Sequence, residues 1–414
     1  MTGVVVAGGG PGGMVLAYLL GRAGVPVTLL EAQPDFDRDF RGDSLHPYTL
    51  ELLDTLGLAD DLLRLPHHPA RSFRFHTPRG TITAADYRGL DSRFPYVALM
   101  PQVRFLNFLA AQAKTLPSCR ILMAAKVIDL LRDGDQVTGV RYRDNHGEHD
   151  LPATLVIGAD GRFSRLRRLA DLPVESLGAS SDLLWFRLPR HPEDPPEADV
   201  DLYFGRDHYV ALLGGVTDWQ VGYTLPKGGY PAAKKAGVTP IQDFVREHVP
   251  WLSDRIQTLT DFDQITLLSL EIARAPRWHR PGVLLLGDAA HVISPVGGNG
   301  ILMAVQDAVE TANQLIPKLR TGRLTEPDLA AVQQAREPAI TEVQMNQTRV
   351  ERRVATARET GKTLAPPPFL RLLTALPWIR TRTARRNAYG PQPPILDATL
   401  LTHPGPVPTR TPKD

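Results

Sequence analysis

The residues best suited to chemistry lie in three stretches, each directly after a short apolar run. The first stretch, "VVVAGGGPGG", holds Gly8, Gly10 and Gly13 in the spacing G-x-G-x-x-G. Between a strand and a helix, such glycines allow a tight turn, a close approach of a pyrophosphate to the backbone, and close packing of the helix on the strand. Glu31 follows at nearly the distance expected for an acid that binds ribose hydroxyls. The pattern predicts a dinucleotide site, for either NAD or FAD.

Two further considerations bear on this first stretch. The helix after the turn would direct its free N–H groups and its positive dipole end at the phosphates. The carboxylate of Glu31 disfavours a 2′-phosphate, since the two negative charges would repel each other. The alternative interpretation is an ordinary glycine-rich turn with a surface glutamate.

The second and third stretches each place an acid just beyond a buried strand. In "VIGADGRFSRLRR" these residues are Asp160 and Gly161, and Asp160 alone could simply cap the next helix. In "VLLLGDAAHVISPVGGNG", Gly287 and Asp288 lie where doubly wound sheets bind ligands, and the carboxylate can accept hydrogen bonds from a polyol such as ribityl. The glycines that follow begin a helix whose N-terminus would face an anionic group.

The elements that must position these residues can be read from the hydrophobic pattern. Residues 3–31 form a βαβ unit, whose right-handed crossover makes its two strands parallel neighbours. Helices are expected at 44–65, 101–116, 240–258 and 299–320, and strands at 120–130, 136–143, 153–158, 264–275 and 283–287. Aromatic and β-branched runs separated by turn residues indicate an antiparallel sheet over 180–226.

The expected architecture is α/β: a doubly wound, Rossmann-like cofactor domain with a smaller sheet domain inserted into it. The cofactor domain is discontinuous, over 1–72, 98–178 and 271–350. A mostly antiparallel substrate-binding sheet takes 73–97 and 179–270. A C-terminal helical segment follows at 351–389, and a proline-rich tail at 390–414 is expected to be extended or flexible.

Composition narrows the possible functions. The chain has 414 residues, a net charge of +2 and one cysteine, Cys119, so nucleic acid is not an expected partner and a dithiol redox centre is excluded. There is no apolar run long enough to span a membrane and no basic signal-peptide region, so a soluble cytoplasmic protein is expected. The arginines at 380, 382, 385 and 386 are typical of a solvated helix face, with an anion-binding patch as the alternative.

Together the three stretches resemble the group A flavoprotein monooxygenases, the para-hydroxybenzoate hydroxylase-like family, over about residues 1–350. The resemblance implies one non-covalent FAD, with its pyrophosphate on the first turn, its adenosine ribose on Glu31, and its ribityl and phosphate on Gly287 and Asp288. It associates Asp160 and Gly161 with both FAD and NAD(P)H. Two more segments, "RGDSLHPYTLELLDTLGL" and "MPQVRF", are family-like. The cofactor contacts implied in addition are Arg41, Gln102, Arg104, Pro295, Gly298, Asn299 and Gly300, with Arg41 and Pro295 near the flavin.

The function implied is hydroxylation of an aromatic or polyketide-like small molecule, with NAD(P)H and O2 as co-substrates and a flavin C4a-hydroperoxide as the oxygen donor. The alternatives are an oxygen-independent reductase of geranylgeranyl-reductase type and a non-catalytic carrier. Many relatives have asparagine where this chain has Leu302, so one flavin contact differs. A monomer or a homodimer is expected.

The remaining candidates have plainer interpretations. His291 is expected to be structural, and His46, His67 and His68 lack partners at metal-ligand spacing, so no metal is expected. Alternation along the inserted sheet should turn some of its aromatic residues toward the flavin, although ordinary packing is the alternative for each. These residues are Trp185, Phe186, Tyr203, Phe204 and Tyr209.

Overall fold

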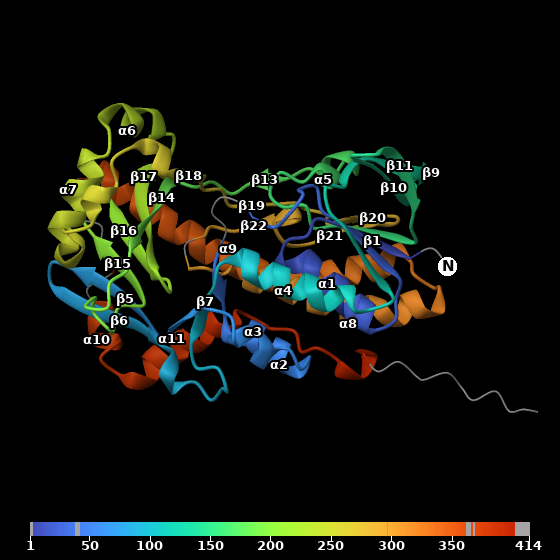
Figure 1. The fold of residues 1–414 in the computed structure, drawn as a ribbon, viewed down its shortest axis with the longest axis horizontal. Coiled ribbons are helices and arrows are strands. Elements are labelled where there is room, and N and C mark those ends of the chain that lie inside the picture. Colours follow the sequence, from blue (N-terminus) through green and yellow to red (C-terminus); the bar gives the residue numbers. More distant parts are fainter. Residues whose placement is uncertain (1–2, 38–41, 296, 362–365, 367–368, 402–414) are drawn as a thin grey trace, which may run out of the picture.

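The computed structural model describes residues 3–37, 42–295, 297–361, 366 and 369–401. Two large sheets dominate it (Figure 1). The first has six strands in the order β20-β21-β12-β1-β2-β8, and all its neighbours are parallel except β20 and β21. Its strands are β1 (Val4–Ala7), β2 (Val27–Leu30), β8 (Cys119–Leu122), β12 (Leu155–Gly158), β20 (His279–Arg280) and β21 (Val283–Leu285).

The register of these parallel strands aligns their carboxyl ends. Ala7 lies opposite both Leu30 and Gly158, and Gly158 lies opposite Leu285. The residues that follow each strand therefore emerge at one edge of the sheet, which is where doubly wound folds bind ligands. This register brings together segments that are up to 280 positions apart in the chain.

Among the described residues, helices cover one face of this sheet and a meander of strands covers the other, which corrects the expectation of a doubly wound arrangement. On the helical face lie α1 (Pro11–Arg22), α4 (Gln102–Lys114) and α8 (Gly300–Thr321). The other face carries an antiparallel meander of β9 (Lys126–Asp133), β10 (Gln136–Asp144) and β11 (Gly147–Pro152), seen above β1 in Figure 1. Val137 and Val140 of the meander are buried in the same core as β12. A meander replaces the second helical layer because its apolar side chains cover that face.

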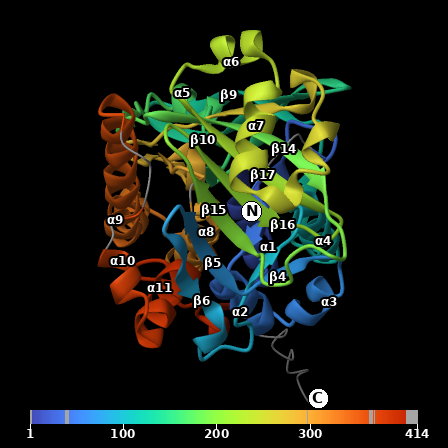
Figure 2. The same ribbon diagram turned by 90° about the vertical axis from the view of Figure 1, so that its left-hand side faces the viewer.

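The second large sheet has seven strands in the order β18-β14-β17-β16-β15-β5-β6. Strands β14 to β17 pair antiparallel, as the pattern over 180–226 predicts, whereas β15 and β5 pair parallel. Helices α6 (Tyr230–Ala236) and α7 (Thr239–His248) cover one face (Figure 2). The strands are β5 (Ser72–Thr77), β6 (Gly80–Asp86), β14 (Ser181–Pro189), β15 (Val200–Phe204), β16 (Tyr209–Gly214), β17 (Asp218–Pro226) and β18 (Thr266–Ser269).

Short strands join the two parts. One three-stranded sheet contains β3 (Ser44–Leu45), β7 (Val97–Leu99) and β4 (His68–Ala70), and another contains β13 (Glu175–Ser176), β19 (Ala273–Arg274) and β22 (His291–Val292). Several predicted elements are divided. The helix expected at 44–65 begins as β3 and continues as α2 (Pro47–Thr55) and α3 (Ala59–Leu63), because Gly57 between them has φ +74°. The helix expected at 240–258 ends at His248, before Pro250, and the strands expected at 120–130 and 264–275 each split in two.

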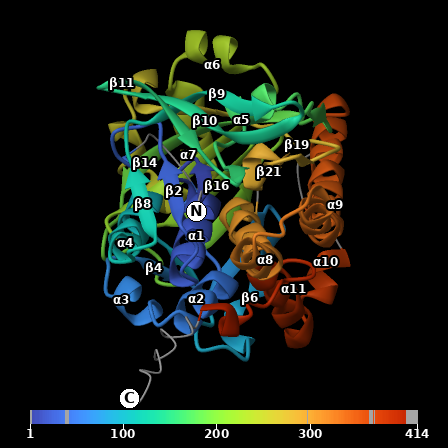
Figure 3. The same ribbon diagram turned by 90° about the vertical axis from the view of Figure 1, so that its right-hand side faces the viewer.

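The C-terminal part wraps around both sheets. Helix α9 (Glu326–Glu359) packs along α8 (Figure 3), and α11 (Pro377–Tyr389) packs on β6 and α2. The short α5 (Arg165–Leu169) and α10 (Phe369–Leu373) complete the helices of the described chain. The described portion of the proline-rich tail, up to residue 401, is not loose: Asn313 donates a 2.8 Å hydrogen bond to the carbonyl of Ile395, and Tyr48 donates to that of Pro394. The rest of the tail lies outside the described residues.

Candidate active site

One cavity of about 1280 Å³ runs from the carboxyl edge of the six-stranded sheet to the inner face of the seven-stranded sheet. It exceeds the roughly 300–1,000 Å³ of an ordinary small-molecule site, which leaves room for two ligands. Residues from all three chemically suggestive stretches line it together. The predicted residues on its wall are Gly8, Gly10, Gly13, Glu31, Gln102, Asp160, Gly161, Gly287, Asp288, Pro295, Gly298 and Gly300.

The three glycines of the first turn have different roles. A Cβ at Gly8, whose φ is +106°, would collide with the carbonyl of Ala159, and one at Gly13 would collide with the carbonyl of Gly8. A Cβ at Gly10 would meet no protein atom within 4 Å, although Gly10 lies on the cavity wall. Gly8 and Gly13 are therefore needed by the fold itself, whereas Gly10 keeps space open for a ligand at the start of α1.

The carboxylate of Glu31 is buried and tied to the backbone around it. Its two oxygens accept hydrogen bonds from the N–H groups of Gly9 (2.8 Å) and Gln33 (2.9 Å). The bond to Gly9 links the end of β2 to the glycine turn after β1. Glu31 therefore stabilises the shape of the turn as well as lining the cavity.

Asp160 also caps a helix, which was the simpler interpretation of it. One carboxylate oxygen accepts from the N–H groups of Arg165 (2.7 Å) and Leu166 (3.0 Å), and the other accepts from the hydroxyl of Ser164. Because Asp160 and Gly161 both line the cavity, capping and a place at the site coexist. Beside them, the wall carries the exposed ring of Phe163 and the side chains of Arg162, Arg165 and Arg168.

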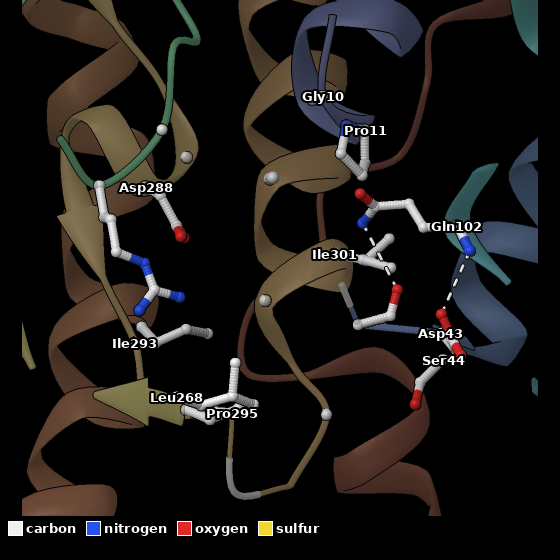
Figure 4. Close-up of a pocket in the computed structure, with 18 of the residues that line it drawn as sticks. Gly10, Pro11, Asp43, Ser44, Gln102, Leu268, Asp288, Ile293, Pro295 and Ile301 are labelled. Atoms are coloured by element: carbon white, nitrogen blue, oxygen red, sulfur yellow. Dashed lines mark hydrogen bonds between the residues drawn. The ribbon is translucent and has the colours of Figure 1, made fainter. Parts of the chain in front are cut away.

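Asp288 lies on a single 3₁₀ turn, η5 (Gly287–Ala289), immediately beyond β21. Figure 4 shows its side chain directed into the space that Gly10 and Pro11 border from above, with Ile293 and Pro295 below it. The turn is anchored from behind, where the N–H of Gly287 donates to the buried carboxylate of Asp307 at 3.0 Å. His291 donates to the same carboxylate at 2.6 Å, and it lies in the protein core rather than on the cavity wall.

The turn before α8 has a histidine behind it. Nε2 of His46 donates to the carbonyl of Gly298 at 3.2 Å. Burial lowers the pKa of His46 to about 4, so the ring is neutral at physiological pH. Asn299 caps α8, and its side-chain oxygen is buried without a hydrogen-bond partner among the described residues. His46 thus supports the turn at which the helix N-terminus meets the cavity.

Two predicted contacts within the described residues are not on this wall. The guanidinium of Arg104 points away and donates to the carbonyl of Pro66 at 2.8 Å. Asn299 belongs to the turn but is not on the wall. Arg41 lies outside the described residues.

The inner face of the seven-stranded sheet forms the far end of the cavity. Along β14 and β16, alternate side chains point inward, among them Leu183, Trp185, Tyr209, Ala211 and Leu213. The intervening side chains, such as Phe186 of β14, pack under α7, and so does Tyr203 of the neighbouring β15. Of the five aromatic candidates, Trp185 and Tyr209 face the cavity, while Phe204 packs against Phe75 and Tyr209. This end of the cavity is mostly apolar.

Comparison with known proteins identifies the family. A family described as "FAD binding domain" matches residues 1–347. The chain belongs to this family. It is 34% identical over 94% of its length to 6-methylpretetramide 4-monooxygenase of Streptomyces rimosus, covering 93% of that protein. It is 28% identical to para-nitrophenol 4-monooxygenase of Pseudomonas sp. strain WBC-3, over 78% of this chain and 80% of that protein.

A solved structure has the same fold. The p-nitrophenol 4-monooxygenase of Pseudomonas putida DLL-E4 superimposes with a TM-score of 0.71 at 23% identity, over 97% of this chain and 95% of that one. The protein is thus an FAD-dependent monooxygenase, and the oxygen-independent reductase is not favoured. NAD(P)H is the co-substrate typical of this family. In the described residues, no helix is long and apolar enough to cross a membrane, and no acidic or histidine cluster has the geometry of a metal site.

The cavity fits the cofactor of this FAD-dependent monooxygenase. Open space next to Gly10 suits a pyrophosphate, and the N-terminus of α8 reaches the cavity at Gly300. The walls between these points carry Asp288, Pro295 and Gln102. Gln102 donates through its backbone N–H to Asp43 (3.2 Å), as Figure 4 shows.

Asp43 and Gln220 are two buried polar wall residues that the sequence analysis did not single out. The amide nitrogen of Gln220, on β17, donates to the carboxylate of Asp43, which lies just before β3. Both are nearly buried, with 5% and 4% of their surfaces exposed, and the amide oxygen of Gln220 has no hydrogen-bond partner among the residues that the structure describes. Burial raises the pKa of Asp43 to about 6, although its hydrogen bonds oppose the rise. An acid just after the family-like Arg-Gly pair was the only available signal.

Proposed function

We propose that the protein hydroxylates an aromatic or polyketide-like compound that carries a phenolic or enolic hydroxyl group, and that it binds this compound on the inner face of the seven-stranded sheet. The observation that carries the proposal is the buried Asp43–Gln220 pair, set into an otherwise apolar wall in the same cavity as the three cofactor stretches. The substrate class of the Streptomyces rimosus relative supports it.

In this proposal the cofactor part of the cavity holds FAD without a covalent bond. The pyrophosphate lies at Gly10 and the N-terminus of α1, the ribityl chain at Asp288, and the ring beside Pro295 and the turn that ends at Gly300. Cys119 is not on the wall, and His46 already donates its Nε2 hydrogen to Gly298. When bound, FAD supplies the reductive activation of oxygen that the reaction requires.

The chain itself binds, orients and handles a proton. The apolar faces of Trp185, Leu183 and Leu213 pack on the substrate and keep water away from the reacting carbon. The free amide oxygen of Gln220 accepts a hydrogen bond from the substrate, and the carboxylate of Asp43 takes up the proton of its hydroxyl group. Loss of that proton makes the ring carbons more electron-rich, which favours attack on an electrophilic oxygen.

The proposal also assigns the domains and the route of NAD(P)H. Residues 1–72, 98–178 and 271–350 carry the cofactor and residues 73–97 and 179–270 the substrate, with 351–389 and the tail as supports. NAD(P)H approaches over the surface of Phe163, Arg162, Arg165 and Arg168, whose ring and positive charges suit a dinucleotide.

The test is a screen of phenols and polyketides against the purified holoenzyme. A substrate should accelerate NAD(P)H oxidation and yield a product heavier by one oxygen atom, as mass spectrometry would show. Trp185→Ala should raise KM for that compound, and Phe186→Leu, on the opposite face of the same strand, is the matched control. Acceleration that produces only peroxide for every compound would contradict the proposal.

Heat denaturation should release all the flavin into the supernatant.

A further inference from the structure

A cluster of large apolar side chains is exposed on α10 and the start of α11. The exposed fractions are 61% for Phe369, 77% for Leu372, 42% for Leu373, 46% for Leu376 and 60% for Trp378. These residues lie within ten positions of one another, next to β6 and away from the six-stranded sheet (Figure 2). Large exposed apolar side chains gathered on one short segment in this way point to a site of interaction.

Positive charge accompanies this apolar cluster. Between residues 360 and 396 the sequence contains one lysine and five arginines but no aspartate or glutamate, although the whole chain has a net charge of only +2. On α11, Trp378, Arg382, Arg385 and Arg386 share one exposed face, since helical residues three, four and seven apart are neighbours. Arg386 pairs with Glu342, whereas no ion pair is recorded for Arg382 or Arg385 within the described chain.

We propose that this surface, Phe369 to Arg386, binds the protein peripherally to an anionic lipid membrane. The leucines, Phe369 and Trp378 would enter the boundary between headgroups and acyl chains, where tryptophan is favoured. Arg382 and Arg385 would pair with lipid phosphates from the same face of α11. Apolar contact and basic charge together meet the requirement for stable membrane association without a spanning helix.

Other occupants fit this surface less well. A second copy of the chain, related by a twofold axis, would set the same arginines against one another. The C-terminal residues 402–414 contribute Arg410 and Lys413 against a single aspartate, so their charge does not complement the surface either.

The position of the surface links it to the cavity. Ala384 and Ala388, on the buried side of α11, pack with Tyr87, Val97 and Leu99, which line the apolar end of the cavity. A protein held through the outer side of α11 would therefore keep this end close to the membrane, where apolar small molecules concentrate.

The test is co-sedimentation of the full-length holoenzyme with vesicles. Vesicles of equal parts phosphatidylglycerol and phosphatidylcholine should bind the protein, and vesicles of phosphatidylcholine alone should bind it weakly. Salt at about 1 M should release the protein, because the Debye length then falls to about 3 Å and the attraction between arginines and lipid phosphates is screened. Arg382→Gln with Arg385→Gln should lower the partition coefficient about 30-fold, since each arginine contributes about fivefold. Leu372→Ser with Trp378→Ser should lower it at least as much.

A matched control is the pair Arg120→Gln and Arg323→Gln, which removes the same charge from exposed positions outside this surface. All variants should keep their flavin content and their rate of NAD(P)H oxidation in solution, because none of these residues lines the cavity. Absence of binding to the anionic vesicles, or equal losses in the control pair, would overturn the proposal. A change in molecular mass by light scattering in the Leu372/Trp378 variant would overturn it in favour of self-association.

Discussion

Replacing Asp43 by asparagine should make the protein more stable and less active at neutral pH. The carboxylate is buried, and it accepts hydrogen bonds from the backbone of Gln102 and from the amide of Gln220. Burial raises its pKa to about 6, above the value of 3.8 for an unperturbed aspartate. The folded state therefore holds the proton more tightly than the unfolded chain does, and ionisation of Asp43 destabilises the fold.

The size of the effect follows from that rise in pKa. A rise of about two units corresponds to about 3 kcal/mol between the protonated and ionised forms. The stabilisation from the proton is complete below pH 4 and is lost as the pH rises through 6. Asparagine imitates the protonated form, and its Nδ2 can donate to the amide oxygen of Gln220 once that amide turns over. At pH 7.5 the variant should gain about 3 kcal/mol, which for 414 residues raises the melting temperature by about 3 °C.

The assay is thermal unfolding of wild type and Asp43→Asn at pH 5.0 and pH 7.5, with turnover measured in parallel. The stability difference should be about twice as large at pH 7.5 as at pH 5.0, because pH 5.0 already lies above the pKa of the unfolded chain. Turnover of a phenolic substrate should fall about a hundredfold or more. Asp307→Asn is the contrasting variant. Burial would raise the pKa of the Asp307 carboxyl, but His291 and Arg336 outweigh burial and lower it, so the loss of this carboxylate should destabilise the protein at neutral pH. A stability difference for Asp43→Asn that does not depend on pH would refute the reasoning.

Three further predictions concern the cofactor. Gly10→Ala should leave the fold intact but abolish FAD retention, whereas Gly13→Ala should prevent folding, as circular dichroism and flavin content would show; equal behaviour of the two variants would contradict the division of roles. Asp288→Ala should raise the FAD dissociation constant about tenfold to a hundredfold, through loss of a charge-assisted hydrogen bond, and titration of the apoprotein with FAD would measure it. Under anaerobic conditions, a true substrate should accelerate flavin reduction at least tenfold (about 1.4 kcal/mol of preference for the reduction-ready state), and equal rates with and without it would disprove such gating.

The cofactor half of the site could be predicted because local spacing determines it. Gly8, Asp160 and Asp288 each follow a short apolar strand, and parallel strands in register must release their carboxyl ends at one edge. The sequence also shows alternation, which correctly divides the aromatic residues of β14 and β16 between two faces. It does not show which face is which, because that depends on where α7 packs.

The substrate half could not be predicted in the same way. Asp43 and Gln220 are 177 positions apart, and they meet because the chain just before β3 packs against β17, an interior strand of the seven-stranded sheet. The meander β9–β11 was missed as a layer for a related reason, since its polar outer residues resemble those of any surface hairpin. Long-range packing of this kind leaves no periodic signal in a single sequence.

Asp307 could not be predicted from the sequence for the same reason, because its partners come from distant parts of the chain, although it organises the end of the third stretch. Its carboxylate, on α8, accepts from the N–H of Gly287, from His291 on β22 and from Arg336 on α9 (2.9 Å). One buried charge thereby fixes the turn that carries Asp288 relative to the helix whose N-terminus faces the cavity. A carboxylate at the end of a strand can act on a ligand only if its backbone is held still, and here a second carboxylate, out of reach of the ligand, does so.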